Sequence, residues 1–332
     1  LEDEALEREL VGFAAAVLPS RAAAAQRAAL LTTVRAAAAE ALGPDARVFL
    51  CGACAGGCGA VGEDLDATLY VPMTAQRSGH GGIFKQDCLR RVAERCRAMG
   101  LMATSGLTVR LEQTVNCGDA DGVPRTCVVG GAMNLHCQSL LPLYGTRLLR
   151  GYVELEPRLP VLVAAVRHWA RAASLEGEQS RGCLPSFAWT LMVVYYLQIA
   201  HGLPSLHAEG RGVAEQRGAC EDNYDVSFLH ALGTGSPTSV PKRSDPSATL
   251  SAAFKGFFLF FGCVFAWHSE VVSALSPDSL ACEFAPACEA NPQPGRLRAW
   301  AGVRSALRDT RPFPGQGVGA AEVEGIQFIA HE

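Results

Sequence analysis

The chain has 332 residues, of which 49% are hydrophobic and 19% are charged, and its formal net charge is −4. This length fits two domains better than one, and the apolar content suffices for a sizeable core. The net charge by itself does not indicate a strongly acidic or basic partner, although a basic cleft is compatible with it. The most apolar run, Gly256 to Trp267, is too short to span a bilayer, so it predicts a buried helix and no membrane partner.

In chain order, hydrophobic periodicity and turn signals predict a helical start, a mixed α/β region and a mostly helical second half. Pro19 is expected to end the first helix and Ser20 to cap the second. Four arginines on the helix over 86–99 are interpreted as a solvated face. The predicted elements are helices over 3–17, 20–42, 86–99, 141–152, 158–173, 185–201 and 250–275, short helices near 225–232 and 295–308, and strands over 47–51, 64–71, 106–117 and 125–137.

Cysteine usage and the N-terminal composition bear on the compartment. The 13 cysteines have no regular spacing, which favours reduced thiols in an intracellular, reducing compartment over a disulfide scaffold. Cys51, Cys54 and Cys58 are spaced as zinc ligands could be, but no second pair follows, so we expect small buried residues. The first residues include acids such as Glu2 and Asp3, whereas a transit peptide is acid-poor, so we expect them to belong to the folded protein after any transit peptide is removed.

Two carboxylates on one predicted strand are the clearest indication of chemistry. Asp64 and Asp66 are two residues apart, so both side chains point to the same face of the strand. Polymerase-type nucleotidyl transfer uses such a pair to hold Mg²⁺, with a third carboxylate on a neighbouring strand. The glycine-rich turn over 52–62 would let backbone amides approach phosphates. Taken alone the pattern is weak, because a solvated strand end also carries paired acids.

Four further segments follow the carboxylate pair in the order of a known family. They are Thr146 to Tyr152, Val166 to Arg171, Gly182 to Phe187 and Phe254 to Ser273. With the carboxylate pair, they resemble the compact terminal uridylyltransferases of mitochondrial RNA editing and the related noncanonical poly(A) polymerases, from about residue 47 to residue 291. The resemblance implies a bilobal nucleotidyltransferase fold of class α/β + α. We expect a mixed-sheet polymerase-type domain over 44–140, a helical poly(A)-polymerase-associated domain over 141–332, and N-terminal helices over 1–43 that pack on the helical domain. A nucleotide would bind in the cleft between the domains.

The resemblance also implies a role for each matching residue. Asp64 and Asp66 fall on the first two metal carboxylates, which would hold Mg²⁺ or Mn²⁺. Arg167 and Arg171 replace lysines that neutralise the triphosphate. Ser186 falls on a hydroxyl that touches the triphosphate, and Phe187 replaces the tyrosine that stacks on the base. The implied nucleotide-binding positions are Gly52, Ala53, Gly145, Thr146, Arg167, Arg171, Ser186 and Phe187.

Several positions depart from the family pattern. Asn134 falls where the third catalytic Asp belongs, and no other Asp or Glu lies between Asp121 and Glu154. Losing one such group commonly lowers a rate by about 10²–10⁴-fold. Ala53 replaces a phosphate-binding serine, and Glu63 adds an acid before the first Asp. Gly145 replaces an asparagine that reads ribose and base. Ala285 and Cys288 replace two acids that help select uracil.

Three hypotheses therefore stay open. The favoured one is a catalytically silent relative, a pseudoenzyme that binds RNA and protein subunits as a scaffold in RNA processing or ribonucleoprotein assembly, with the mitochondrial matrix as its compartment. The second is an active RNA 3′-terminal uridylyltransferase or adenylyltransferase that uses UTP and two Mg²⁺ ions. The third is an unrelated α/β protein, which would lack a mixed sheet carrying Asp64 and Asp66 side by side.

Overall fold

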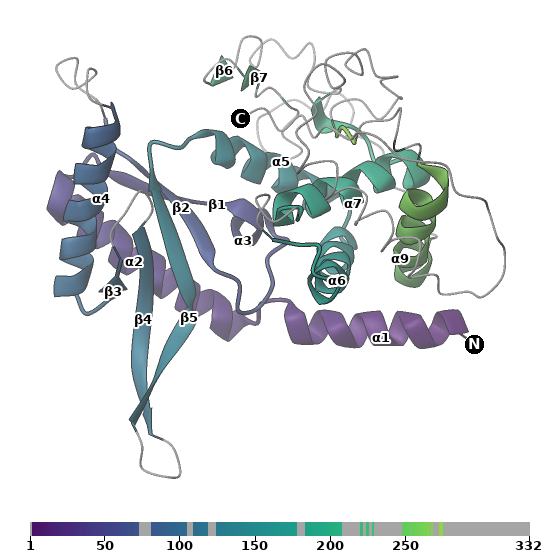
Figure 1. Ribbon diagram of the computed structural model, residues 1–332, viewed down its shortest axis with the longest axis horizontal. Coiled ribbons are helices and arrows are strands. Elements are labelled where there is room, and N and C mark those ends of the chain that lie inside the picture. The colour runs from purple at the N-terminus through teal and green to yellow at the C-terminus, as the bar shows by residue number, and fades with distance from the viewer. Residues whose placement is uncertain are drawn as a thin grey trace. The chain divides into compact units, whose positions relative to one another are not determined.

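The computed structural model describes residues 2–72, 81–104, 109–118, 124–177, 183–207, 220–221, 224–225, 228, 248–265, 267 and 272–274. The chain divides into two compact units (Figure 1). The sheet unit comprises residues 17–150, and the helical unit comprises residues 1–16 with 151–332.

A five-stranded mixed sheet forms the sheet unit, in the order β1-β2-β5-β4-β3 (Figure 1). The strands β2 and β5 are parallel, whereas the other neighbours are antiparallel. The strands are β1 (Arg47–Cys51), β2 (Leu65–Tyr70), β3 (Met102–Ala103), β4 (Val109–Gly118) and β5 (Pro124–Cys137). The predicted mixed-sheet class is confirmed.

One face of this sheet is buried under α2 (Arg21–Leu42) and α4 (Gly81–Ala98). Because side chains alternate along a strand, Leu65, Ala67 and Leu69 of β2 all enter this core, where each is at most 2% exposed. The residues between them point to the opposite face. The sheet therefore has a dry face that stabilises the unit and a second face that is available for chemistry.

The two N-terminal helices belong to different units. In α1 (Glu2–Val17), the carboxylate of Glu7 accepts the backbone N–H of Ser251, so this helix contacts the helical unit. The helix α2 instead buries Leu30 and Val34 in the core of the sheet unit, each 0% exposed. The prediction that both helices pack on the helical domain is therefore wrong for α2, because its apolar stripe covers the sheet.

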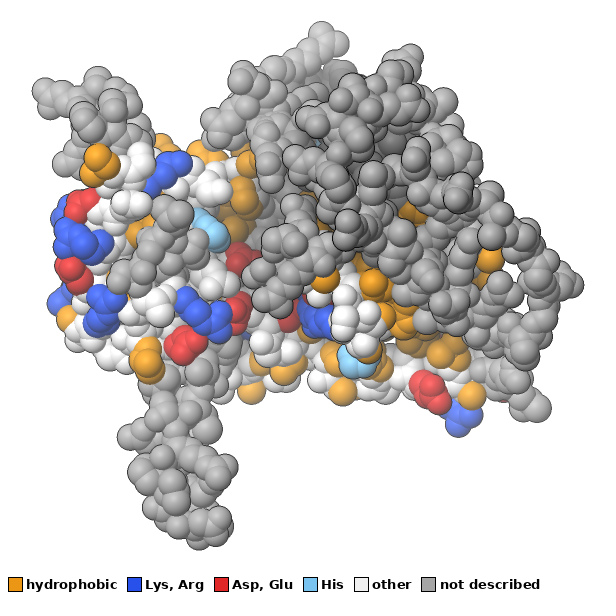
Figure 2. All heavy atoms as spheres, in the orientation of Figure 1, with side chains coloured by type: hydrophobic (Ala, Val, Ile, Leu, Met, Phe, Trp, Pro, Cys, Tyr) orange, Lys and Arg blue, Asp and Glu red, His pale blue; other side chains and the backbone are white. Residues whose placement is uncertain are grey.

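The solvated face of α4 carries charges of both signs (Figure 2). Arg90 lies 2.8 Å from Glu94 and 2.5 Å from Asp87, one turn away on either side. All three side chains are about half exposed. Such exposed pairs contribute little to stability, which fits the prediction of a solvated face.

Helices with an aromatic core make up the helical unit. Trp169 packs edge-on against Phe258 and Trp189, with ring centroids 4.9 and 6.0 Å away, and Trp189 is 0% exposed. No helix in the described ranges is both long enough and apolar enough to cross a bilayer. The elements are α1, the end of α5 (Leu141–Leu155), α6 (Leu159–Ala172), α7 (Ser186–His201), α9 (Leu250–Leu259), the π-helical turn η3 (Phe260–Val264) and the strand pair β6 (Cys220–Glu221) and β7 (Tyr224–Asp225).

The helix predicted over 250–275 is shorter in the structure. It passes from α9 into η3 and ends at Phe265, whose backbone is extended with ψ 124° and whose N–H donates to the carbonyl of Phe260. This wider hydrogen-bonded turn breaks the α-helical repeat. The helix predicted near 295–308 lies outside the described residues. The one predicted near 225–232 lies almost wholly outside them and begins at β7.

Candidate functional site

The open face of the sheet brings the predicted catalytic residues into one row across three strands. In the parallel pairing of β2 with β5, Asp66 lies directly opposite Asn134. In the antiparallel pairing of β5 with β4, Asn134 lies opposite Arg110. Residues that pair across a sheet put their side chains on the same face, so these three are immediate neighbours.

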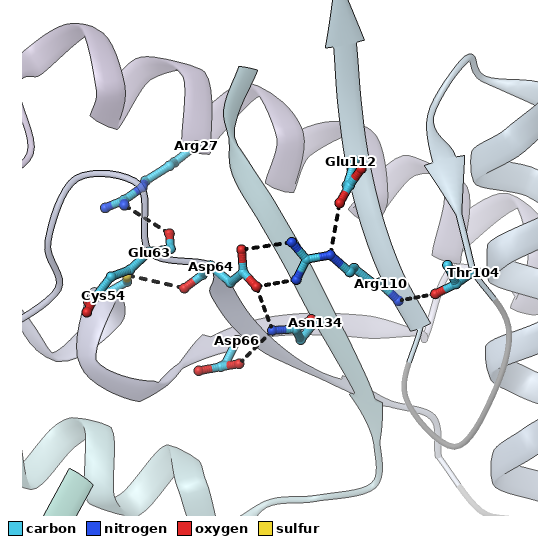
Figure 3. A network of polar contacts seen from close by, with 9 residues as sticks. All are labelled: Arg27, Cys54, Glu63, Asp64, Asp66, Thr104, Arg110, Glu112 and Asn134. Atoms are coloured by element: carbon cyan, nitrogen blue, oxygen red, sulfur yellow. Dashed lines mark hydrogen bonds and ion pairs between the residues drawn. The ribbon is translucent and has the colours of Figure 1, made fainter. Parts of the chain in front are cut away.

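Asn134 occupies the place that the third carboxylate was expected to have, on the strand next to the acidic pair. Its side-chain nitrogen lies 3.5 Å from Asp64 Oδ2 and 3.4 Å from Asp66 Oδ1 (Figure 3). The amide nitrogen is a hydrogen-bond donor, so in this arrangement it satisfies the two carboxylates and offers no negative charge. Asn134 therefore lies next to the acidic pair, as predicted, but its side chain acts as a hydrogen-bond donor to the pair.

A guanidinium group also faces the pair. Arg110 forms a two-nitrogen ion pair with Asp64, in which Nη2 lies 3.3 Å from Oδ1 and Nη1 contacts Oδ2 (Figure 3). The Nε of Arg110 donates to Glu112 Oε1 at 2.9 Å. These hydrogen bonds to Asp64 and then Glu112 raise the pKa of Arg110 further above its usual value. Arg110 is thus a permanent cation held between two carboxylates.

Burial and neighbouring charges shift the titration of this face. The pKa of Asp66 is raised, first because burial disfavours the carboxylate and then because Asp64 and Glu63 are negative. The hydrogen bond from Asn134 and the charge of His136 oppose this increase. On the adjoining strand β1, burial and the negative charge of the same aspartate raise the pKa of the Cys51 thiol to about 12.

The glycine-rich segment after β1 forms the short helix α3 (Gly52–Gly56) against the acidic pair. Gly52 has a φ of +79°, and a Cβ atom there would lie 2.7 Å from Asp66 Oδ2. Its N–H donates to the Thr146 hydroxyl at 2.9 Å, and that hydroxyl donates to the carbonyl of Pro142. The structure thus brings together the predicted residues Gly52, Asp66 and Thr146, but the amide of Gly52 binds a side chain of its own unit.

The loop that leads into Asp64 is fixed from α2. Arg27 is 9% exposed and donates to the carbonyl oxygens of Ala60 at 2.8 Å and Glu63 at 3.2 Å (Figure 3 shows the second bond). The carboxylate of Glu63, which was expected beside a triphosphate, accepts the backbone N–H of Ala60 at 2.9 Å. It closes the loop and still contributes to the raised pKa of Asp66.

The cysteines near the glycine-rich turn are packing residues. Cys51 and Cys58 are 4% and 0% exposed, and the thiol of Cys54 donates to the carbonyl of Asp64 at 3.4 Å. Within the ranges that the structure describes, no group of three or more His, Cys, Asp or Glu could hold a metal ion. The burial of Cys51 and Cys58 agrees with the expectation of small buried residues in a turn, whereas Cys54 is half-buried.

The two arginines expected at the triphosphate lie on α6 of the helical unit. Arg167 is 5% exposed, and its Nε and Nη2 lie 3.0 and 2.9 Å from the two carboxylate oxygens of Glu176. Arg171 donates to the same carboxylate at 2.9 Å, while its side chain remains 43% exposed. One acid therefore neutralises part of this charge, leaving the trio with a formal charge of +1.

The remaining predicted positions are distributed over both units. Ser186 and Phe187 begin α7 in the helical unit, and the Phe187 side chain is an exposed aromatic at 40%. Ala53 lies in α3 and Gly145 in α5 of the sheet unit. The replacements at residues 285 and 288 lie outside the described residues.

Three functional candidates were missed from the sequence, namely Arg110, Glu112 and Glu176. The alternation Val109-Arg110-Leu111-Glu112 is the signal that could have placed both charges of β4 on one face. Which neighbours that face would meet depends on strand pairing, and β4 is far from Asp64 in the sequence. Glu176 follows α6 with no motif of its own.

Comparisons with known proteins agree with this geometry. Poly(A) RNA polymerase GLD2-A of Xenopus laevis is 25% identical over 237 residues, which cover 69% of this chain and 42% of that protein. Poly(A) RNA polymerase cid13 of Schizosaccharomyces pombe is 28% identical over 185 residues, which cover 54% of this chain and 30% of that protein. The chain thus spans less than half the length of these curated relatives. No protein-family model matches it.

Solved structures of the Cid1 poly(U) polymerase have the same fold. One, a mutant bound to MgATP, has a TM-score of 0.70 and 19% identity, with 93% of this chain and 96% of that chain covered. Another, in complex with the UTP analogue UMPNPP, has a TM-score of 0.65 and 20% identity, with 83% and 79% covered. The chain is thus similar in sequence to poly(A) RNA polymerases, and it has the nucleotidyltransferase fold of the Cid1 structures.

Proposed function

We propose that this chain is a catalytically silent or strongly impaired RNA nucleotidyltransferase that acts as an RNA-binding subunit in RNA processing or ribonucleoprotein assembly. The observation that carries the proposal is the pairing of Asp66 with Asn134 in adjacent strands. An amide stands where polymerase chemistry needs a third carboxylate, and such a loss commonly lowers a rate by about 10²–10⁴-fold.

The residues at this face do not fit a pair of divalent metals. Mg²⁺ is bound by converging oxygen ligands in near-octahedral geometry. Here the oxygens of Asp64 accept from Arg110, and an amide nitrogen of Asn134 points at both carboxylates. Cid1 is bound to MgATP in one of its structures.

RNA is the proposed ligand because the helical unit keeps groups that bind phosphate and bases. The half-exposed Arg171 offers a cation for phosphate, and the exposed ring of Phe187 offers a surface for stacking. Nucleotides such as UTP or ATP carry the same phosphate and base groups as RNA, and we propose them as secondary ligands. Protein subunits of an assembly and a location in the mitochondrial matrix remain predictions.

RNA binding and nucleotide addition can be measured separately on the full chain. Fluorescence anisotropy with a labelled single-stranded RNA is expected to show binding that Phe187→Ala weakens by about 1–3 kcal/mol, the usual contribution of base stacking. Ile199→Ala is the matched control, because Ile199 is a similarly exposed apolar residue of α7, at 44%. Equal affinity of both variants for RNA would contradict the role of Phe187.

Primer extension tests catalysis with each of the four nucleoside triphosphates in Mg²⁺ or Mn²⁺. The expected result is no extension above background. Efficient extension that Asp66→Ala abolishes would overturn the proposal and support the alternative, an active uridylyltransferase or adenylyltransferase. The side-by-side arrangement of Asp64 and Asp66 before and within β2 is the observation that favours this alternative. Asn134→Asp would then be expected to increase the extension rate.

A further inference from the structure

Hydrogen-bond donors fill the space in front of the acidic pair. Arg110 reaches from β4 past β5 to Asp64 and donates to both of its carboxylate oxygens. Asn134 points its nitrogen at Asp64 and Asp66, at 3.5 and 3.4 Å. Both oxygens of Asp64 and Oδ1 of Asp66, which could otherwise bind a metal, are therefore directed at N–H groups.

The position of Arg110 is set by the sheet and by a second acid. Arg110 pairs with Asn134, which in turn pairs with Asp66, so strand register places the guanidinium on the face of the acidic pair. Glu112, two residues along the same strand, accepts from Arg110 Nε at 2.9 Å. A guanidinium with acceptors on two of its edges has a defined orientation.

The formal charge of the site differs from that of a two-metal site. Three carboxylates carry −3, whereas Asp64, Asp66 and the guanidinium of Arg110 sum to −1. The attraction between a divalent cation and its ligands scales with the ligand charge, so the guanidinium weakens the attraction. The remaining carboxylate of Glu112 lies on the far side of the guanidinium and is engaged by it.

We infer that the guanidinium of Arg110 is the resident cation of the Asp64–Asp66 pair and takes the place of a divalent metal there. This inference deepens the proposed silence of the site, on which it rests. The acidic pair is then stable without metal, and a divalent ion binds only by displacing a side chain that is covalently attached and always charged.

Mn²⁺ binding and thermal unfolding test the inference on the full chain, without any activity readout. Free Mn²⁺ is measured by electron paramagnetic resonance, and Tm is measured in EDTA and in Mn²⁺. For the unsubstituted protein we expect no saturable Mn²⁺ binding and the same Tm in both conditions. Saturable binding with a rise in Tm in Mn²⁺ would overturn the inference.

Two variants extend the test. Arg110→Gln changes the formal charge from −1 to −2, and we expect it to lower Tm in EDTA and to make Tm rise with Mn²⁺. The double variant Arg110→Gln with Asn134→Asp has a formal charge of −3 at these positions. We expect it to bind Mn²⁺ at least about tenfold more tightly than the single variant. Arg90→Gln, which removes an exposed arginine of α4, is the matched control and should change neither property.

The failures of the two proposals are distinguishable. If the unsubstituted chain binds Mn²⁺ yet extends no primer, Arg110 is not the resident cation, while the proposed function stands. If neither of the two variants that replace Arg110 changes the Tm in EDTA, Arg110 does not stabilise the acidic pair and the inference is wrong. Circular dichroism of each variant establishes that the measurement is made on folded protein.

Discussion

Replacing Gly52 by alanine perturbs the contact between the glycine-rich turn and the acidic pair. Gly52 has a φ of +79°, a conformation that is unfavourable for any residue with a Cβ atom. The added methyl carbon would also lie 2.7 Å from Asp66 Oδ2 and 3.4 Å from Asp66 Cβ. The carboxylate also accepts from Asn134, so turning it away from the methyl group disturbs that contact.

Two terms set the size of the effect. The left-handed backbone costs about 1–2 kcal/mol for a non-glycine residue. Forcing an extra carbon into an occupied space costs typically about 1–3 kcal/mol. Gly62 is the matched control, because its φ is also +79° but nothing lies within 4 Å of its Cβ position. We therefore expect Gly52→Ala to destabilise the sheet unit by about 1–3 kcal/mol more than Gly62→Ala.

Urea unfolding followed by circular dichroism measures the difference. All four tryptophans lie in residues 151–332, so their fluorescence reports the helical unit and serves as an internal reference. In an Asp66→Ala background the excess cost of Gly52→Ala should disappear, because the contacted carboxylate is gone. Equal destabilisation by the two alanine substitutions, within about 0.5 kcal/mol, would refute the reasoning.

Further predictions concern a buried ion pair and a buried thiol. Glu176→Gln should remove the carboxylate that pairs with the buried Arg167 and destabilise the helical unit by about 3–5 kcal/mol, measured by tryptophan fluorescence in urea. Glu94→Gln in the sheet unit, at a pair with side chains 54% exposed, should cost less than about 1 kcal/mol by circular dichroism in urea, and a similar loss in both would contradict the argument. Because the pKa of Cys51 is raised to about 12, iodoacetamide at pH 8 should alkylate the exposed Cys263 well before Cys51. Peptide mass mapping measures the two rates of alkylation, and comparable rates would refute the expected inertness of Cys51.

Local patterns in the sequence predicted most of the elements near the site. Ser20 was expected to cap the second helix, and its hydroxyl accepts the N–H of Ala23. The alternation in Asp64-Leu65-Asp66 placed two carboxylates on one face, because side-chain direction in a strand depends only on neighbouring residues. The position of Asn134 next to the pair was implied by the resemblance to the family, in which a third Asp stands there.

Contacts between distant segments could not be predicted in the same way. The apolar stripe of α2 was compatible with either unit, and only packing against the sheet decided for residues 17–150. The charges of Arg167 and Arg171 were predicted, but not that Glu176 would engage both. Such pairings depend on where the chain returns after a loop, which a local pattern does not encode.

Through its resemblance to a known family, the sequence by itself predicted the nucleotidyltransferase fold and an amide at the position of the third catalytic Asp, because both follow from residue types in order along the chain. Only the tertiary structure decided which side chains face the acidic pair. Strand register lines up Asp66, Asn134 and Arg110 in one row, so an amide and a guanidinium face the acids. Register is set by pairing across the whole sheet, and a shift of one residue would have turned these side chains to the opposite face.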